Sequence, residues 1–363
     1  MVAHHPCPEC AGPLEWSAKA QQLQCPYCGT QVPWQQEQAP GAQQAIVEHD
    51  LAQALEHPRS GRGWGQGRYE VQCQSCRAIS TFDAQHTAKR CDFCGSAAIV
   101  AHDSGRDAIT PESILPFQIS AAQVRERLRQ WYGSRWFAPN RLKTAALTDT
   151  VRGVYLPYWT FDAQASAQWR AEAGHYYYTT ETYRNSNGQL QTRQVRHTRW
   201  EPATGQLQHF FDDALVPGTV GVHAALLRQI EPFPTTSDLQ AYRPDFVRGW
   251  TVERYQIDLG QAAKTNVEQM DAVLRQQCIA QIPGDTWRNF SMQRQYQGRT
   301  FKHVLVPVWL VSYRYGRKNY QVVANGYTGT IAGERPYSWV KIFFAVLLAL
   351  GVLALAVWAT QQT

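Results

Sequence analysis

The chain carries CPEC at residues 7–10 and CPYCG at residues 25–29, and it repeats the arrangement as CQSC at residues 73–76 and CDFCG at residues 91–95. Fourteen residues separate the two CxxC pairs in each set. A CxxC turn aims two sulfur atoms at one point, and a loop of this length brings the second pair round to complete a tetrahedron. The glycine after each second pair permits the left-handed turn that lets backbone N–H groups approach sulfur. Both sets therefore have the spacing of a zinc ribbon.

We predict two closed, structural zinc sites, because a tetrahedral site of four thiolates has no open coordination position. Disulfide pairs and redox-active CxxC motifs are the alternatives, and the matched repeat together with the absence of a signal peptide argues against both. The ninth cysteine, Cys278, lies on the apolar face of a predicted helix, where we expect a small core residue. The predicted ligands of the two Zn²⁺ ions are Cys7, Cys10, Cys25, Cys28, Cys73, Cys76, Cys91 and Cys94.

The composition allows a sizeable core and gives little support for nucleic-acid binding. The chain has 363 residues, of which 44% are hydrophobic and 12% aromatic, enough for two or three domains. The formal net charge of +6 treats the cysteines as neutral. Each filled four-cysteine site carries a net charge of about −2, so the working charge is about +2. Such a small excess is weak evidence for a nucleic-acid partner.

No enzymatic motif stands out in the chain. It contains no Walker A loop, no HExxH, no GxSxG and no GxGxxG after a strand. The carboxylates are scattered along the sequence. We therefore expect a protein without enzymatic activity and assign no catalytic or cofactor-binding residue. An active site assembled from distant residues stays an alternative.

Changes of composition along the chain predict six segments. We expect the two ribbons to be presented on a flexible arm, because the stretch between them is rich in Gln, Ala, Gly and Pro. The segments are zinc ribbon one at 1–34, a flexible linker at 35–67, zinc ribbon two at 68–102, a second linker at 103–113, an α+β body at 114–336 and a transmembrane tail anchor at 337–360.

The body shows an internal repeat. Residues 121–132 follow a capping box, residues 261–281 have apolar residues at helical spacing, and both are predicted helices. Residues 153–163 and 303–315 share an apolar run that contains Pro-x-Trp, and Asn187-Gly188 predicts a hairpin turn. We therefore predict the fold class α+β, with two small N-terminal zinc ribbons, a pseudo-duplicated antiparallel sheet-plus-helix body and one C-terminal transmembrane helix.

The C-terminal stretch predicts a membrane span. Residues 342–360 read IFFAVLLALGVLALAVWAT, nineteen residues without a charge. As a helix they would extend about 28 Å, close to the thickness of the hydrocarbon core. Arg335 and Lys341 precede them, and positive charge on this side predicts that the large domain lies in the cytoplasm. We expect a single-pass, tail-anchored protein of the inner (cytoplasmic) membrane whose partners include membrane lipid.

A row of cations on the predicted hairpin has three interpretations. Arg193, Arg196, His197 and Arg199 lie near three consecutive tyrosines at 176–178. Charge with stacking groups suits single-stranded nucleic acid, and the same charge suits anionic lipid headgroups. The third and favoured interpretation is the ordinary solvated face of a sheet.

Several stretches of the body carry a resemblance to a known family. They are ILPFQI at 114–119, WFAPNRLK at 136–143, GVYLPYWTFDA at 153–163, FDDALVP at 211–217, ERYQIDL at 253–259, FKHVLVPVW at 301–309 and NGYTGTIAGERPYSWVKI at 325–342. Ribbon two also matches, and the likeness covers roughly two thirds of the chain. In these stretches the chain is similar to bacterial membrane-anchored double zinc-ribbon proteins, whose members are often labelled as primosomal-helicase-like or as transcription-factor-type zinc ribbons.

The resemblance implies an adaptor. Helicase activity is not carried over, because a helicase needs an ATP-binding loop and the chain has none. Some members of the family look like partners of flotillin-like membrane-scaffold proteins and of envelope-stress systems. The resemblance thus implies a non-enzymatic, membrane-anchored zinc-ribbon adaptor that presents its cytoplasmic ribbons to a protein partner. The alternative is a membrane-tethered nucleic-acid-binding protein related to replication or transcription.

Overall fold

The computed structural model describes residues 7–12, 14–17, 22–32, 46–56, 68–83, 90–102, 108–139, 151–186, 188–247, 249–315 and 318–361. The glycine-rich part of the predicted first linker, residues 60–67, and residue 187 of the predicted hairpin turn lie outside these ranges.

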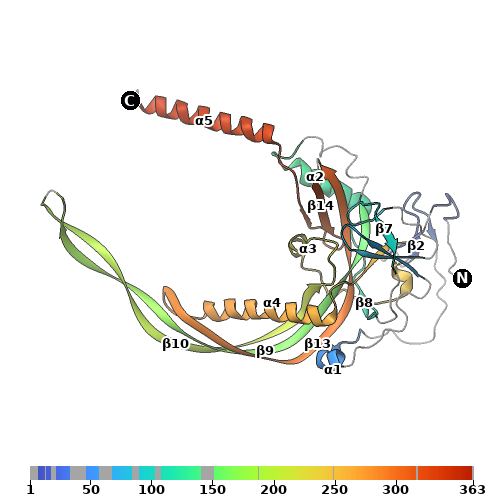
Figure 1. The fold of residues 1–363 in the computed structure, drawn as a ribbon, viewed down its shortest axis with the longest axis horizontal. Coiled ribbons are helices and arrows are strands. Elements are labelled where there is room, and N and C mark those ends of the chain that lie inside the picture. Colours follow the sequence, from blue (N-terminus) through green and yellow to red (C-terminus); the bar gives the residue numbers. More distant parts are fainter. Residues whose placement is uncertain are drawn as a thin grey trace.

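Three very long strands form the spine of the molecule: β9 (Arg152–Arg184), β10 (Leu190–Pro217) and β13 (Thr286–Tyr315). They contain 33, 28 and 30 residues, several times the usual strand length of about 5–6 residues. β9 lies between the other two and pairs antiparallel with both. Figure 1 shows them as one curved three-stranded sheet, with the β9–β10 hairpin projecting beyond the end of β13. The predicted hairpin is therefore present as a long arm.

Helix α4 (Leu259–Ala280) lies on the concave side of this three-stranded sheet (Figure 1). Alternate residues of β9 are alanines on the helix side, and their small side chains let the helix approach the sheet closely. Met270, Leu274 and Cys278 of α4 pack against them, and each is at most 1% exposed. Cys278 is thus the core residue that its helical position predicts. The buried alanines of β9 are Ala163, Ala165, Ala167, Ala171 and Ala173.

Two β-bulges lie at the same level of the three-stranded sheet, where the sheet curves away from the body. β10 carries a register shift between Phe211 and Ala214, and β13 carries one between Gln297 and Thr300. Both shifts lie beside Asp162 on β9. A bulge bends its strand and increases the local twist, so two bulges at one level account for curvature there.

Short strands widen the sheet at the body end. They are β4 (His49–Asp50), β5 (Arg68–Cys73), β6 (Ile79–Asp83), β7 (Ile99–Ala101), β8 (Ser113–Ile114), β11 (Gln240–Ala241), β12 (Thr251–Arg254), β14 (Lys318–Asn325) and β15 (Ile331–Gly333). A separate sheet holds β1 (Glu15–Ser17), β2 (Gln22–Gln24) and β3 (Gln31–Val32). The other helices are α1 (Leu51–Glu56), α2 (Ala121–Gly133), α3 (Ala224–Ile230), the 3-10 helix η3 (Pro244–Val247) and α5 (Trp339–Gln361).

The α+β class is confirmed, but the sheet is mixed, and the purely antiparallel body predicted from the sequence is wrong in this respect. β8 runs parallel to β13, and β12 runs parallel to β9. The alternation of polar and apolar residues sets the face that a side chain occupies, but it does not set the direction of the neighbouring strand. The parallel pairings of β8 with β13 and of β12 with β9 therefore could not be predicted from the sequence pattern.

Ribbon two and part of the first linker belong to the body. β6 of the ribbon pairs with β12, so the ribbon strands continue the main sheet. In the linker, β4 pairs with β13, and Leu51 at the start of α1 is 1% exposed. The expected flexible arm carrying both ribbons is therefore replaced by a docked arrangement for ribbon two and for residues 49–56.

The repeated Pro-x-Trp segments pair with each other at the centre of the sheet, where Leu156 lies opposite Val306. The carbonyl of Pro157 accepts the N–H of Gly218, and the carbonyl of Pro307 accepts the N–H of Gly326, at 2.8 Å in both cases. Each glycine carbonyl then accepts two N–H groups from the segment that leads into a helix. These donors are Gln256 and Ile257 for Gly218, and Gln118 and Ile119 for Gly326.

The two tryptophans complete this match. The indole Nε1–H of Trp159 donates to the carbonyl of Ile257 at 2.9 Å, just before α4, and that of Trp309 donates to Ile119 at 2.8 Å, just before α2. The strand of each half thus fixes the start of the other half's helix. These matching hydrogen bonds give the predicted internal repeat a structural basis.

The predicted transmembrane tail anchor at 337–360 is wrong by the structural criterion. In the described part of the chain, no helix is both long and apolar enough to cross a membrane. Helix α5 (Trp339–Gln361) forms at the predicted place but does not count as such a span. The finding also overturns the membrane, transmembrane and tail-anchored assignments, the lipid partner bound through this helix, and the single-pass inner-membrane location.

The packing of α4 on the sheet predicts a contrast between two adjacent residues. Leu274 is fully buried, whereas Val273 is 39% exposed. We expect Leu274→Ala to lower the free energy of unfolding by about 2–5 kcal/mol, because it leaves a cavity under the helix. The matched control Val273→Ala should change it by no more than about 0.5 kcal/mol. Urea denaturation of the full chain measures both, and equal losses would contradict the packing described.

Candidate metal centres

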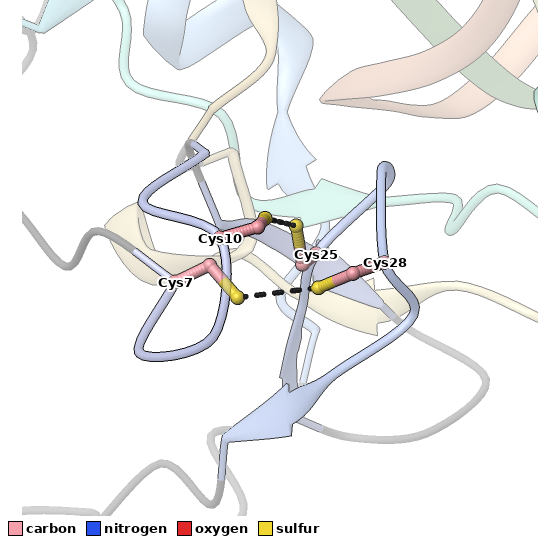
Figure 2. Close-up of side chains that lie close together, drawn as sticks. All are labelled: Cys7, Cys10, Cys25 and Cys28. Carbon is pink, nitrogen blue, oxygen red and sulfur yellow. Dashed lines mark hydrogen bonds between the residues drawn. The ribbon is translucent and has the colours of Figure 1, made fainter.

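Ribbon one brings four predicted cysteines together from two turns. Cys7 and Cys10 lie on the turn before β1, and Cys25 and Cys28 lie on the turn between β2 and β3. Figure 2 shows the four side chains converging from the two turns. The Sγ atoms of Cys7 and Cys28 are 3.4 Å apart, as are those of Cys10 and Cys25.

Ribbon two repeats this geometry. Cys73 is the last residue of β5, Cys76 follows that strand, and Cys91 and Cys94 precede β7. The Sγ atoms of Cys73 and Cys94 are 3.5 Å apart, and those of Cys76 and Cys91 are 3.6 Å apart. In each tetrad, all four sulfur atoms lie within 4.8 Å of one another.

Both tetrads fit a four-coordinate metal ion. Zn–S bonds of about 2.3 Å at tetrahedral angles place neighbouring sulfur atoms about 3.8 Å apart, near the closest separations in both ribbons. A disulfide needs an S–S bond of about 2.05 Å, and all eight cysteines are free thiols here. The structure thus groups the eight predicted residues into two clusters that can hold a metal ion, consistent with zinc. Their role as ligands stays a prediction.

All four CxxC turns have the same backbone. In each turn the N–H four residues after the first cysteine donates to that cysteine's carbonyl, at 2.8–2.9 Å. The residue that donates has a positive φ in every case: 76° at Gly29, 71° at Gly95, 57° at Ala11 and 64° at Arg77. The sequence predicted this for the two glycines alone. A left-handed alanine or arginine is strained, and such residues persist where the surrounding structure fixes them. The fourfold repeat of the turn therefore supports a common purpose, the aiming of two sulfurs.

One cysteine of each ribbon is readily deprotonated. Hydrogen bonds from the side chain and backbone of Thr30 lower the pKa of the Cys28 thiol to about 6, and the Thr30 hydroxyl lies 3.0 Å from its sulfur. In ribbon two, a hydrogen bond from Cys76 lowers the pKa of Cys91 to about 6 against the opposing effect of burial. Metal binding requires thiolates, and these hydrogen bonds favour the thiolate form of a cysteine in each tetrad.

Ribbon two is anchored in the body through its second turn. Phe93 is fully buried, and its carbonyl accepts the side-chain N–H of Gln321 on β14 at 3.1 Å. Asp92 accepts the hydroxyl of Thr251 on β12 at 2.8 Å. Cys73 and Cys91 belong to the same buried cluster as the central strand residues of β9 and β13. The four-cysteine cluster of ribbon two is therefore in contact with the body's core.

A buried ion pair adds to this anchor. Arg254 of β12 donates to Glu70 of β5 at 3.1 Å, and their side chains are 14% and 2% exposed. Removing one partner of such a pair is strongly destabilising, because the other charge stays buried. The sequence did not predict that these two residues pair, since they lie 184 positions apart in the chain.

Ribbon one also packs on the body but leaves its metal site more open. Leu23 and Cys25 are 1% exposed and share a buried cluster with Ile114 and Val252. Cys10 and Cys28 are exposed, whereas their counterparts in ribbon two are half-buried. Solvent and partners therefore reach the first tetrad more easily than the second.

The predicted cations of the hairpin lie on the arm, and all four have partners, including His197, whose Nε2 lies 2.8 Å from the Thr179 hydroxyl. Arg193 pairs with Glu181 at 3.0 Å, and Arg199 pairs with Glu201 at 2.9 Å. The guanidinium of Arg196 lies 4.3 Å from the centre of the Tyr176 ring. This arrangement agrees with the solvated sheet face that the sequence analysis favoured.

Metal content should follow the eight cysteines. We predict about two zinc ions per chain by atomic spectroscopy, about one for Cys28→Ser or Cys94→Ser, and two for the control Cys278→Ser, because one four-sulfur cage is lost in each of the first two variants. Cys94→Ser should also lower the melting temperature more than Cys28→Ser, since ribbon two continues the main sheet. An unchanged zinc content in both ligand variants would contradict the two-cage arrangement.

The left-handed residues predict opposite effects of two substitutions. Arg77→Gly should raise the free energy of unfolding of the metal-loaded protein by about 0.5–1 kcal/mol, because glycine adopts the observed φ without strain. Gly95→Ala should lower the free energy of unfolding by about 1 kcal/mol, because alanine is strained at this positive φ. Steric clash adds nothing, since no atom lies within 4 Å of the added methyl group. Chemical denaturation measures both, and changes of the same sign would refute a shared turn geometry.

Comparison with known proteins gives one similar protein and no function. The "Uncharacterized protein YdjG" of Bacillus subtilis (strain 168) is 23% identical over 249 residues, which cover 68% of this chain and 70% of that protein. No protein-family model matches the chain, and no solved structure matches it. These comparisons do not establish the family that the sequence resembles, and what the structure supports is two four-cysteine clusters that could form zinc-ribbon-like sites on an α+β body.

Proposed function

We propose that the protein is a non-enzymatic zinc-ribbon scaffold that binds a protein partner, with two structural Zn²⁺ ions and with the β9–β10 arm as the binding element. The observation that carries this proposal is the open edge of β9. β13 begins at Thr286, opposite Gly174, and β9 continues from there to Arg184 with β10 on one side alone. A strand edge of this kind is the surface on which an extended peptide adds to a sheet.

The direction of the free backbone groups follows from the last contacts of β13. Gly174 accepts the N–H of Asp285 at 2.8 Å, and the N–H of Tyr176 donates to the carboxylate of Asp285 at 2.7 Å. Backbone groups alternate between the two sides of a strand, so Tyr178, Thr180 and Thr182 also face this side. Within the described residues, no strand pairs with β9 there. Their N–H and C=O groups are available to an added strand.

The composition of this edge favours strand addition. Residues 176–184 read YYYTTETYR, which is rich in tyrosine and threonine, and they contain no proline, glycine or lysine. Tyrosine and threonine favour extended backbone, and proteins usually block an exposed edge with proline, lysine or a bulge. β10, by contrast, carries both Pro202 and a bulge. The unblocked edge of β9 supports a role in binding.

Two further observations support the proposal over its alternatives. A closed four-sulfur cage has no open position for a substrate, which favours structural zinc over catalysis. The hairpin arginines Arg193 and Arg199 are paired with carboxylates on the arm itself, which weakens their attraction for phosphates. A protein partner therefore suits the arm better than a nucleic acid does.

A single backbone position tests the proposal. Thr180→Pro removes an N–H on the open side of β9 and leaves the hydrogen bonds to β10 in place. In affinity purification after nuclease treatment, we expect Thr180→Pro to recover at least about tenfold less of the protein partner than the wild type does. The matched control Thr180→Ala keeps the backbone donor and should recover the partner at the wild-type level.

Two outcomes would overturn the proposal. Equal recovery by Thr180→Pro would show that the β9 edge is not the docking surface. Recovery of nucleic acid in place of protein, with an affinity that falls steeply between low and moderate salt, would establish the nucleic-acid-binding alternative.

A further inference from the structure

A cavity of about 400 Å³ lies between α2, α3, β15 and the segment that leads into α5. Its volume is within the usual range of small-molecule sites, about 300–1,000 Å³. It belongs to neither ribbon and lies on different elements from the arm. Its lining includes Trp131, Arg135, Ile331, Glu334, Arg335 and Tyr337.

Two arginines of this cavity have no acidic partner within the described part of the chain. The guanidinium of Arg135 lies 5.1 Å from the centre of the Trp131 ring, and that of Arg335 lies 5.6 Å from the centre of the Tyr337 ring. Stacking uses the face of a guanidinium, so its in-plane N–H donors stay available. The Nε of Arg135 is buried without a hydrogen-bond partner. Such an atom in a folded protein calls for an explanation, and a bound ligand is one.

The single carboxylate of the cavity is already engaged. Oε1 of Glu334 lies 2.9 Å from Nδ1 of His223, a residue outside the lining. Two guanidinium groups and one carboxylate give the cavity a net positive charge. An anionic ligand would balance this charge, and a terminal phosphate offers negative charge together with three acceptor oxygens. A bare phosphate ion is much smaller than the cavity, and Trp131, Tyr337 and Ile331 offer apolar surface for an attached group.

We propose that this cavity binds a small phosphate monoester, with Arg135 and Arg335 holding the phosphate and the Trp131 and Tyr337 rings contacting the organic group. Guanidinium groups bind phosphate through paired, charge-assisted hydrogen bonds, which gives both arginines a role that the protein alone does not supply. The site is independent of partner binding at the arm, so either can fail without the other.

Calorimetric titration of the full zinc-loaded chain tests this site with three probes: phenyl phosphate, inorganic phosphate and benzoate. We expect saturable binding of one phenyl phosphate per chain, at least about tenfold tighter than inorganic phosphate because of ring burial. Benzoate carries the same ring with a single negative charge, and it should also bind at least about tenfold more weakly than phenyl phosphate. Benzoate binding as tight as that of phenyl phosphate, or no saturable binding, overturns the proposal.

Substitutions locate the site. Arg135→Gln and Arg335→Gln should each weaken phenyl phosphate binding at least about tenfold, since each removes charge-assisted hydrogen bonds. Arg129→Gln is the control on the adjacent helix α2, because Arg129 is exposed and paired with Glu126 at 3.2 Å. It should leave the affinity unchanged. An affinity that neither arginine substitution alters, in variants with wild-type circular dichroism, assigns the binding elsewhere and refutes the proposal.

Discussion

The pairing of two matching strand segments at the centre of the sheet holds the rest of the molecule in place. Leu156 and Val306 lie opposite each other, and on both sides a proline carbonyl, a glycine and a tryptophan indole fix the start of a helix. Because each tryptophan bonds to the segment just before the helix of the other half, neither half is complete alone. The two zinc ribbons, the β9–β10 arm and the cavity beside α2, α3 and β15 all contact these paired segments of β9 and β13, directly or through one further strand.

The metal cages have unequal places in this arrangement. Ribbon two joins the main sheet through β6 and β12, and its cysteines are buried against the central strands. A filled cage at this position would stiffen the body itself, since metal-binding energy is folding energy in such modules. Ribbon one packs on the surface of the same core with two cysteines exposed. A rigid body with a projecting arm suits a scaffold, in which one surface is held fixed while another meets a partner.

The cysteine clusters and the start of α2 could be predicted from the sequence because they depend on nearby residues. The strand pairings and the left-handed backbone of Arg77 could not be predicted, because they depend on residues far apart in the chain. Cysteine spacing identified both tetrads, and the capping box placed α2 correctly from Ala121, with Ser120 as its N-cap. The long reach of β9 and its parallel pairing with β12 had no local signal, because alternation does not encode the neighbour of a strand. The apolar C-terminal stretch predicted a membrane span that the described structure does not support. The left-handed backbone of Arg77 follows from tertiary constraint and not from its residue type.

The most direct test of this account is hydrogen exchange of the full chain before and after zinc is removed by a chelator. If the second cage is part of the body's core, its loss should speed amide exchange in β6 and also in β12, where Val252 and Glu253 pair with the ribbon. Faster exchange confined to residues 68–102, with β12 and the central strands unchanged, would contradict the account and make ribbon two an independent module.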